Sequence, residues 1–251
     1  MKKITVLTQS YHQPELLEIL VRSFEKYKID DVEISYLIIE GSSNTSYANH
    51  IKSLSKNIVW FNNDAADEKN PIIGASAANG KNIEFGKKMI QTDWTFVCHN
   101  DVAVTSKKFF ETFLKLSENY ELISTCKDNA RICACHISGL FVKTELLQKV
   151  DCMPALPELD VGDRLTQYCR DEGLNYISLP NSHNDESILR SISGLWNELG
   201  TSCGVDRCIV AGEVIFTHLG RGTPKSLNAY SKTGKITYQG WIKLHQDELK
   251  K

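Results

Sequence analysis

The sequence lacks a large excess of charge of either sign. Its 251 residues include 29 Lys plus Arg and 31 Asp plus Glu, which gives a formal net charge of −2. Binding to a phosphate backbone usually needs a clear basic excess, so this balance argues against nucleic acid as a partner. Hydrophobic residues make up 41% of the chain, as in an ordinary globular protein, and the length is sufficient to bury a sizeable core.

Long apolar runs and export signals are also lacking. No run of 18 apolar residues occurs, so we expect no segment to span a bilayer. The N-terminal stretch "MKKITVLTQSY" has a basic start, but Thr8, Gln9 and Ser10 interrupt its apolar part. It therefore predicts a first strand and not a signal peptide. We expect a cytoplasmic protein. The basic, aromatic tail "QGWIKLHQDELKK" leaves peripheral contact with the inner face of the membrane open, although its acidic residues favour a solvated helix.

The eight cysteines lack the paired C-x-x-C spacing of structural zinc sites. The segment "CKDNARICACH" does hold four side chains that are able to bind zinc, namely Cys126, Cys133, Cys135 and His136. Alternation along a strand would place Cys135 and His136 on opposite faces. We therefore expect reduced thiols in the cytoplasm and leave a zinc site at this segment as the alternative.

Strand-like and helical segments alternate along the chain. The segment 14–27 places Leu17, Leu20, Val21 and Phe24 at the spacing of an amphipathic helix, and apolar segments at 3–8 and 32–41 are typical of strands. Further helices are predicted at 77–91, 107–120, 144–150, 159–173, 187–199 and 239–251, and further strands at 57–62, 93–104, 121–126, 136–143 and 213–223. The alternation predicts an α/β fold with a mainly parallel sheet and helices on both faces. No repeat, low-complexity segment or linker divides it.

A polar cluster interrupts the apolar segment "FVCHNDVAV". His99, Asn100 and Asp101 follow Phe96, Val97 and Cys98 before the apolar pattern resumes. Ligands of parallel sheets gather at the carboxyl ends of the strands, so we expect a ligand here. The alternative is that His99 merely ends the strand and Asp101 forms a turn.

Several segments, taken in order, resemble a known enzyme family. They are "VLTQSYHQPELLEILVRSF", "LIIEGSS", "GASAANGKNIEFG" with "DWTFVCHNDVAV", "HISGLFVKTELLQKV", "LDVGDRLTQYCRDEGLNYISLP" and "THLGRGT". Their order is similar to that of the GT-A glycosyltransferases, and within them to the large inverting family 2. The resemblance covers the chain from about residue 4 to residue 223.

The resemblance implies a single GT-A (Rossmann-like) domain over 1–251, of the nucleotide-diphospho-sugar transferase type. Residues 1–104 would be the nucleotide-sugar-binding half, and 105–251 the acceptor-binding half with the tail. The implied activity is transfer of a sugar to a saccharide or lipid-linked acceptor, as in polysaccharide biosynthesis. The implied nucleotide-sugar contacts are Thr8, Gln9, Ser10, Tyr11, Glu40, Asn79, Lys81, Asn100 and Arg221. Oligomeric state is left open.

The metal site implied by the resemblance departs from the family pattern. Asp101 takes the last acidic position of an Asp-x-Asp-like motif, but His99 takes the first, and the late His218 would join them. The implied cofactor is Mn²⁺ or Mg²⁺. Because imidazole suits softer metals better than Mg²⁺, the histidines favour Mn²⁺. The alternative is that Glu40 and His218 are ordinary polar residues at strand ends and that Arg221 is a solvated loop residue.

The implied catalytic base is Asp160, with Asp163 as the next candidate. The family commonly has two adjacent acids, whereas this chain has Leu159 followed by Asp160. Asp160 would take the proton of the acceptor hydroxyl. Both aspartates are also suited to the start of the helix that follows, as a cap or as a first-turn residue.

Two other functions are weighed against sugar transfer. A non-catalytic nucleotide-binding or scaffold protein with the same fold is the alternative, because the metal motif and the acidic motif are both altered. A nucleotidyltransferase needs a glycine-rich N-terminal loop with basic residues for a triphosphate. The segment "TQSYHQPE" has neither, which argues against that class.

Overall fold

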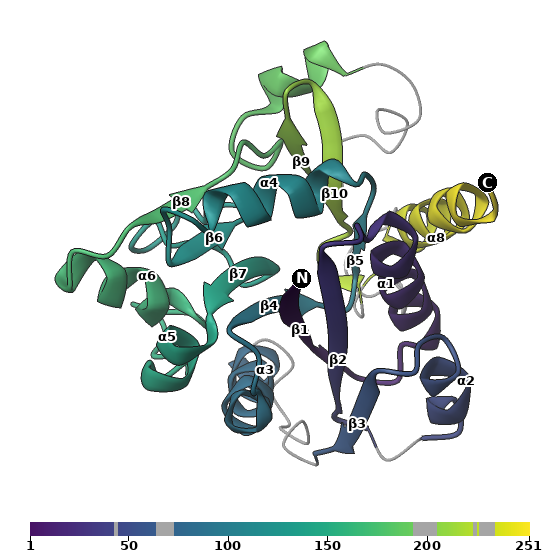
Figure 1. Ribbon diagram of the computed structural model, residues 1–251, viewed down its shortest axis with the longest axis horizontal. Coiled ribbons are helices and arrows are strands. Elements are labelled where there is room, and N and C mark those ends of the chain that lie inside the picture. Colours follow the sequence, from purple (N-terminus) through teal and green to yellow (C-terminus); the bar gives the residue numbers. More distant parts are fainter. Residues whose placement is uncertain (43–44, 64–72, 193–204, 223–224, 226–233) are drawn as a thin grey trace.

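The computed structural model describes residues 1–42, 45–63, 73–192, 205–222, 225 and 234–251 (Figure 1). Its centre is a sheet of seven strands in the order β3-β2-β1-β4-β7-β6-β8. The bounds of these strands are β1 Lys2–Ser10, β2 Val32–Glu40, β3 Ile58–Asn62, β4 Trp94–His99, β6 Leu122–Ser124, β7 Gly139–Lys143 and β8 Tyr176–Ser178. Only β7 runs antiparallel to its neighbours. The prediction of a mainly parallel sheet is confirmed.

The predicted single strand at 93–104 is wrong. The chain leaves the large sheet after His99, and Val102–Val104 form β5 in a second sheet of three antiparallel strands. The other strands of that sheet are β9 Asp206–Val210 and β10 Glu213–His218, with β10 in the middle. Asn100 and Asp101 therefore connect the large sheet to the second sheet. Because the apolar pattern resumes after the polar cluster, the sequence did not indicate that the two halves belong to different sheets.

Helices cover both faces of the large sheet, as predicted. Because neighbouring residues of a strand point to opposite faces, Val6 and Phe96 belong to one apolar cluster while Leu7 and Val97 belong to the other. The first cluster also holds buried residues of α1 Pro14–Tyr27 and α4 Lys108–Leu116. The second holds residues of α3 Ile73–Gly86, α5 Thr144–Lys149 and α6 Asp163–Asp171. Shorter helices are α2 Ala48–Lys52, η2 Lys87–Met89 and η3 Glu186–Ser191.

The C-terminal tail forms a helix, α8 Gly234–Lys250, that lies beside α1 (Figure 1). Trp241 is fully buried and shares an apolar cluster with Leu16, Ile19 and Tyr238. The apolar face of α8 is thus covered by the body of the protein. Among the described residues, no helix is long and apolar enough to cross a membrane. The predicted helix at 187–199 begins as η3, and its residues beyond 192 lie outside the described residues.

Candidate functional site

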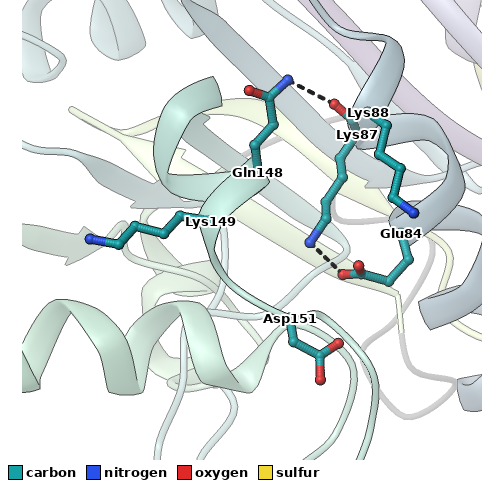
Figure 2. Close-up of a pocket in the computed structure, with 6 residues that line it drawn as sticks. All are labelled: Glu84, Lys87, Lys88, Gln148, Lys149 and Asp151. Carbon is teal, nitrogen blue, oxygen red and sulfur yellow. Dashed lines mark hydrogen bonds and ion pairs between the residues drawn. The ribbon is translucent and has the colours of Figure 1, made fainter.

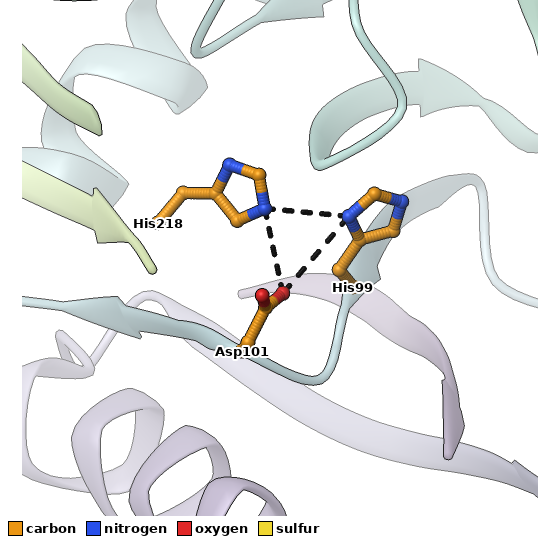
Figure 3. Close-up of side chains that lie close together, drawn as sticks. All are labelled: His99, Asp101 and His218. Carbon is orange, nitrogen blue, oxygen red and sulfur yellow. Dashed lines mark hydrogen bonds and ion pairs between the residues drawn. The ribbon is translucent and has the colours of Figure 1, made fainter. Parts of the chain in front are cut away.

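Asp101 lies at the step from β4 to β5, and its buried carboxylate is held on two sides. Oδ2 accepts a hydrogen bond from the backbone N–H of Gly222 at 2.9 Å. Oδ1 lies 3.4 Å from Nε2 of His218, at the end of β10, and 4.0 Å from Nδ1 of His99, at the end of β4. Figure 3 shows these three side chains pointing toward one another. The fold therefore brings the three predicted metal ligands together.

The loop after β10 packs closely against Asp101, which explains why the second glycine of "THLGRGT", Gly222, is needed. The backbone N–H of Leu219 donates to the backbone carbonyl of Asp101 at 2.9 Å. A Cβ added to Gly222 would lie 2.8 Å from Cβ and 2.9 Å from Oδ2 of Asp101, closer than real Cβ atoms come to such neighbours. The close approach of this loop to Asp101 therefore requires a residue without a side chain at position 222.

The electrostatics of the site favour a positive charge beside Asp101. Burial lowers the pKa of His218, but the charge of Asp101 and hydrogen bonds to Asp101 and Asp206 outweigh burial and raise the pKa to about 10. Burial raises the pKa of Asp101, but the charge of His218 and its hydrogen bond hold that pKa well below the usual range. Burial, with the charge of His218, lowers the pKa of His99 to about 3. Among these side chains, the positive charge beside Asp101 is that of protonated His218.

The three side chains form a donor set that is able to hold a divalent cation. Within the described residues, the only group of three or more His, Cys, Asp or Glu side chains with ligand atoms inside 4.8 Å is His99, Asp101 and His218. Ligands on one metal at about 2.0–2.2 Å lie roughly 3 Å apart, so the observed spacing needs only a small inward movement. Two imidazoles and one carboxylate suit Mn²⁺ better than Mg²⁺.

Asn79 of α3 contacts His99 on the side away from Asp101. Its Nδ2 lies 3.3 Å from Nε2 of His99, while its Oδ1 is buried without a hydrogen-bond partner. Rotation of the Asn79 side-chain amide by 180° exchanges the positions of Nδ2 and Oδ1. Oδ1 then accepts a hydrogen bond from Nε2–H of His99. In that tautomer, Nδ1 of His99 carries a lone pair that faces Asp101. Asn79 was expected to contact the nucleotide. Its position also makes it a partner of a candidate ligand.

The predicted nucleotide-binding residues of β1 lie at the same carboxyl edge. Thr8 and Gln9 each have a buried side-chain oxygen without a hydrogen-bond partner, and a bound ligand is one way to satisfy such oxygens. Oγ of Ser10 lies 3.4 Å from Nδ2 of Asn100, which joins the end of β1 to the site. Tyr11 is half exposed, with 52% of its surface open to solvent.

Glu40 ends β2 and is fully buried. One of its oxygens accepts hydrogen bonds from the backbone N–H groups of His12 and Ser42, each at 2.9 Å. The other accepts from the hydroxyl of Tyr47. Glu40 therefore holds the loop after β1 in place. A contact between Glu40 and a nucleotide stays a prediction, as do the contacts of half-buried Lys81 on α3 and exposed Arg221 after β10.

The two candidate bases differ in what their carboxylates contact. Asp163, at the start of α6, accepts from the backbone N–H of Asp160 at 2.8 Å and from Nε of Arg131 at 3.0 Å. Burial raises the pKa of Asp163, although these hydrogen bonds oppose the shift. Asp160 has a side chain that is 34% exposed, with Oδ2 3.7 Å from Arg131. Asp163 is thus buried and tied to Arg131, whereas Asp160 has the more exposed side chain, although its Oδ1 accepts from the backbone N–H of Val161 at 2.8 Å.

The cysteine segment does not assemble a metal group in the described part of the chain. Cys126 and Cys135 are buried, and burial raises the pKa of the Cys135 thiol to about 11. His136 turns toward the candidate metal site instead, with its ring centroid 5.9 Å from that of His99 and 6.2 Å from that of His218. Its Nδ1 lies 2.8 Å from Oγ of Ser138.

An open cavity of about 550 Å³ lies between η2 and α5 (Figure 2). Its lining includes Lys87, which is paired with Glu84 at 2.6 Å, and Gln148, which donates to the carbonyl of Lys87. None of the predicted site residues lines it. The cavity is lined by η2, which precedes β4 in the chain, and by α5, which follows β7 where that strand pairs with the start of β4. The candidate metal ligands lie at the opposite end of β4. We therefore assign the function to the other end of the strand.

Comparison with known proteins identifies the fold. No protein-family model matches the sequence, and no curated protein matches it significantly. Among solved structures it resembles the mannosyltransferase PcManGT from Pyrobaculum calidifontis, solved with GDP-Man and Mn²⁺, with a TM-score of 0.50 and 14% sequence identity. The match covers 70% of this chain and 54% of that one. This chain has the GT-A fold.

Two further structures are similar at lower scores. Glucosyl-3-phosphoglycerate synthase from Mycobacterium tuberculosis has a TM-score of 0.49 and 14% identity, over 70% of each chain. S. aureus TarS 1-349, solved with UDP-GlcNAc, has a TM-score of 0.45 and 15% identity, over 62% of this chain and 49% of that one. The chain thus spans about half the length of PcManGT and of TarS 1-349.

Proposed function

We propose that this protein is a glycosyltransferase that moves a sugar from a nucleotide-diphosphate donor to an acceptor hydroxyl. The observation that carries the proposal is the convergence of His99, Asp101 and His218 at the carboxyl end of β4 in a GT-A fold. Ligands of open α/β sheets bind at this edge. The GDP-Man and Mn²⁺ bound to PcManGT make that pair the first donor and metal to test.

The three converging side chains would hold the divalent cation, with Mn²⁺ favoured over Mg²⁺. A cation in this position neutralises the negative charge that grows on the diphosphate as the glycosidic bond breaks. Arg221 and Lys81 supply further positive charge for the diphosphate or ribose. The forked donors of an arginine suit two phosphate oxygens at once.

The nucleotide would lie along the end of β1. The buried Oε1 of Gln9 has no hydrogen-bond partner in the structure and would accept from a donor of the nucleotide. Thr8 precedes it on the strand, with its side chain fully buried beside Cys98. Ser10, Tyr11 and Asn100 border the same edge, and Glu40 keeps the loop in shape through its three hydrogen bonds. Asn79 would hydrogen-bond to His99 and would also contact the ribose of the nucleotide.

Asp160 would act as the catalytic base. Its carboxylate takes the proton of the acceptor hydroxyl, the oxygen forms a bond to the anomeric carbon, and the bond from that carbon to the diphosphate breaks. Attack from the face opposite the diphosphate inverts the anomeric centre. The acceptor is a saccharide or a lipid-linked saccharide, as in polysaccharide assembly at the inner face of the membrane.

The proposal is tested by the thermal stability of the protein with UDP, GDP, dTDP and CMP, each with Mn²⁺ and with EDTA. A ligand that binds only the folded state raises stability by mass action. We expect one nucleoside diphosphate to raise the melting temperature, and to do so only with Mn²⁺. No shift with any nucleotide would contradict the proposal.

A non-catalytic nucleotide-binding protein is the second candidate. It is favoured by the replacement of two family acids by His99 and Leu159. The two candidates differ in turnover. Incubation with the sugar donor of the stabilising nucleotide, in the presence of Mn²⁺ and candidate saccharides, releases the nucleoside diphosphate if the protein is a transferase. Binding without release would favour the second candidate.

A further inference from the structure

Asp206 contacts His218 on the side away from the candidate metal site. The two residues are direct partners across the antiparallel pair β9 and β10. Oδ2 of Asp206 lies 3.0 Å from Nδ1 of His218, and both side chains are largely buried. Nothing in the sequence pattern marked Asp206, because it belongs to a strand that reaches the site only through sheet pairing.

The two nitrogens of His218 have separate partners. Nδ1 donates to Asp206, and Nε2 faces Asp101 and His99 (Figure 3). An imidazole that donates from one nitrogen to a carboxylate presents the lone pair of the other nitrogen to a metal. The contact with Asp206 therefore selects the nitrogen that would bind the cation and fixes the direction of the ring.

The Asp206 carboxylate is itself held in place. Its second oxygen, Oδ1, lies 3.5 Å from Nδ1 of His183. The next residue along β9, Arg207, donates its backbone N–H to Oγ of Ser182 at 2.9 Å, which ties the strand to the segment that carries His183. The two contacts together favour the orientation in which Oδ2 of Asp206 faces His218.

We propose that Asp206 is a positioning residue of the metal centre, which orients His218 for ligation through Nε2 and strengthens its binding to a divalent cation. This inference rests on the proposed function, because it requires a metal at His99, Asp101 and His218. Carboxylate partners of metal-bound histidines typically contribute 10–100-fold to metal affinity. We expect a loss of that size when Asp206 is removed.

The test is a Mn²⁺ titration of the full chain without nucleotide, with free Mn²⁺ measured by electron paramagnetic resonance. The variants are Asp206→Ala and the isosteric Asp206→Asn, with Asp101→Ala as the loss-of-site reference. Asp185→Asn is the matched control, because Asp185 only caps the exposed helix η3. We expect Asp206→Ala to bind Mn²⁺ about 10–100-fold more weakly than the wild type, and Asp185→Asn to bind it equally well.

The outcomes separate the two proposals. Mn²⁺ binding by the wild type that Asp101→Ala removes and both Asp206 variants retain within twofold would overturn the role of Asp206 and leave the metal site standing. No specific Mn²⁺ binding by the wild type would overturn both proposals. If Asp206→Ala does not fold, as judged by circular dichroism, Asp206→Asn provides the comparison.

A second readout distinguishes positioning of His218 from general damage to the site. Competition against Mn²⁺ gives the affinities for Co²⁺ and Mg²⁺. Co²⁺ prefers imidazole ligands, whereas Mg²⁺ depends on oxygen ligands such as Asp101. Because Asp206 acts through an imidazole, its loss should weaken Co²⁺ binding at least several-fold more than Mg²⁺ binding. Equal weakening of both would overturn the proposed role.

Discussion

At the scale of single residues, the sequence identified the three candidate ligands but not the groups that hold them. His99 and Asp101 stood out because they follow an apolar segment, where ligands of α/β sheets gather, and His218 was implied by the resemblance to the GT-A glycosyltransferases. Asp206 and the backbone of Gly222 reach the site through β-sheet pairing and a loop. Contacts of this kind have no local signature. The roles of Asp160 and Asp163 likewise differ through Arg131, which lies 29 to 32 residues earlier in the chain.

Gly222→Ala is expected to weaken metal binding. The new Cβ would displace Asp101, because it would lie 2.8 Å from the Asp101 Cβ. The same Mn²⁺ titration measures the effect, and we expect at least a tenfold weaker affinity, about 1.4 kcal/mol. Gly173→Ala is the control. It strains a left-handed residue at the end of α6 but meets no atom within 4 Å, so it should leave Mn²⁺ affinity unchanged.

Asp160→Asn and Asp163→Asn should separate catalysis from structure. We expect Asp160→Asn to keep donor binding and to abolish transfer, because the proton acceptor is lost. Asp163→Asn should lower the free energy of unfolding by about 1–3 kcal/mol, because Arg131 loses its ionic hydrogen bond to the buried carboxylate at position 163. Transfer rates and urea unfolding curves measure the two effects. Transfer that survives in Asp160→Asn but not in Asp163→Asn would reverse the assignment.

At the scale of elements, most helices and strands followed their apolar patterns, and the errors have physical reasons. The strand at 93–104 was predicted as one element because Val102 to Val104 repeat the apolar character of Phe96 to Cys98. The break lies where Asp101 contacts β10 and its loop. The tail was expected to be a solvated helix, but α8 buries Trp241 against α1. An amphipathic pattern gives the apolar face of a helix without giving the surface that covers it.

His245 on α8 predicts how stability depends on pH. Burial of its ring lowers its pKa to about 3, and Nε2 lies 2.9 Å from Oγ1 of Thr217. The unfolded chain binds a proton near pH 6.5 that the folded chain binds only near pH 3, so stability falls as pH decreases through this window. This one group should cost about 2 kcal/mol between pH 7 and pH 5. His245→Gln, which has no such titration, should lose correspondingly less stability in urea unfolding at the two pH values.

At the scale of the whole molecule, the fold was predictable and the substrates were not. Alternating strands and helices gave the α/β class, and the order of the motifs gave the GT-A fold that the structure of PcManGT supports. The donor's base and sugar are set by contacts that form when a ligand binds, and neither the alternation of elements nor the order of the motifs specifies them. The acceptor is equally unspecified. What the geometry does specify is a group of two imidazoles and one carboxylate, able to hold a cation, at the carboxyl end of β4.

The most direct test of the account is calorimetric titration of the stabilising nucleoside diphosphate into the wild type and into Asp101→Ala, each with Mn²⁺ and with EDTA. If Asp101 links nucleotide to protein through the cation, the wild type binds at least tenfold more tightly with Mn²⁺ than with EDTA. Asp101→Ala should show no such difference while keeping its fold. Equal affinity of the wild type with and without Mn²⁺ would contradict the proposed metal-diphosphate site.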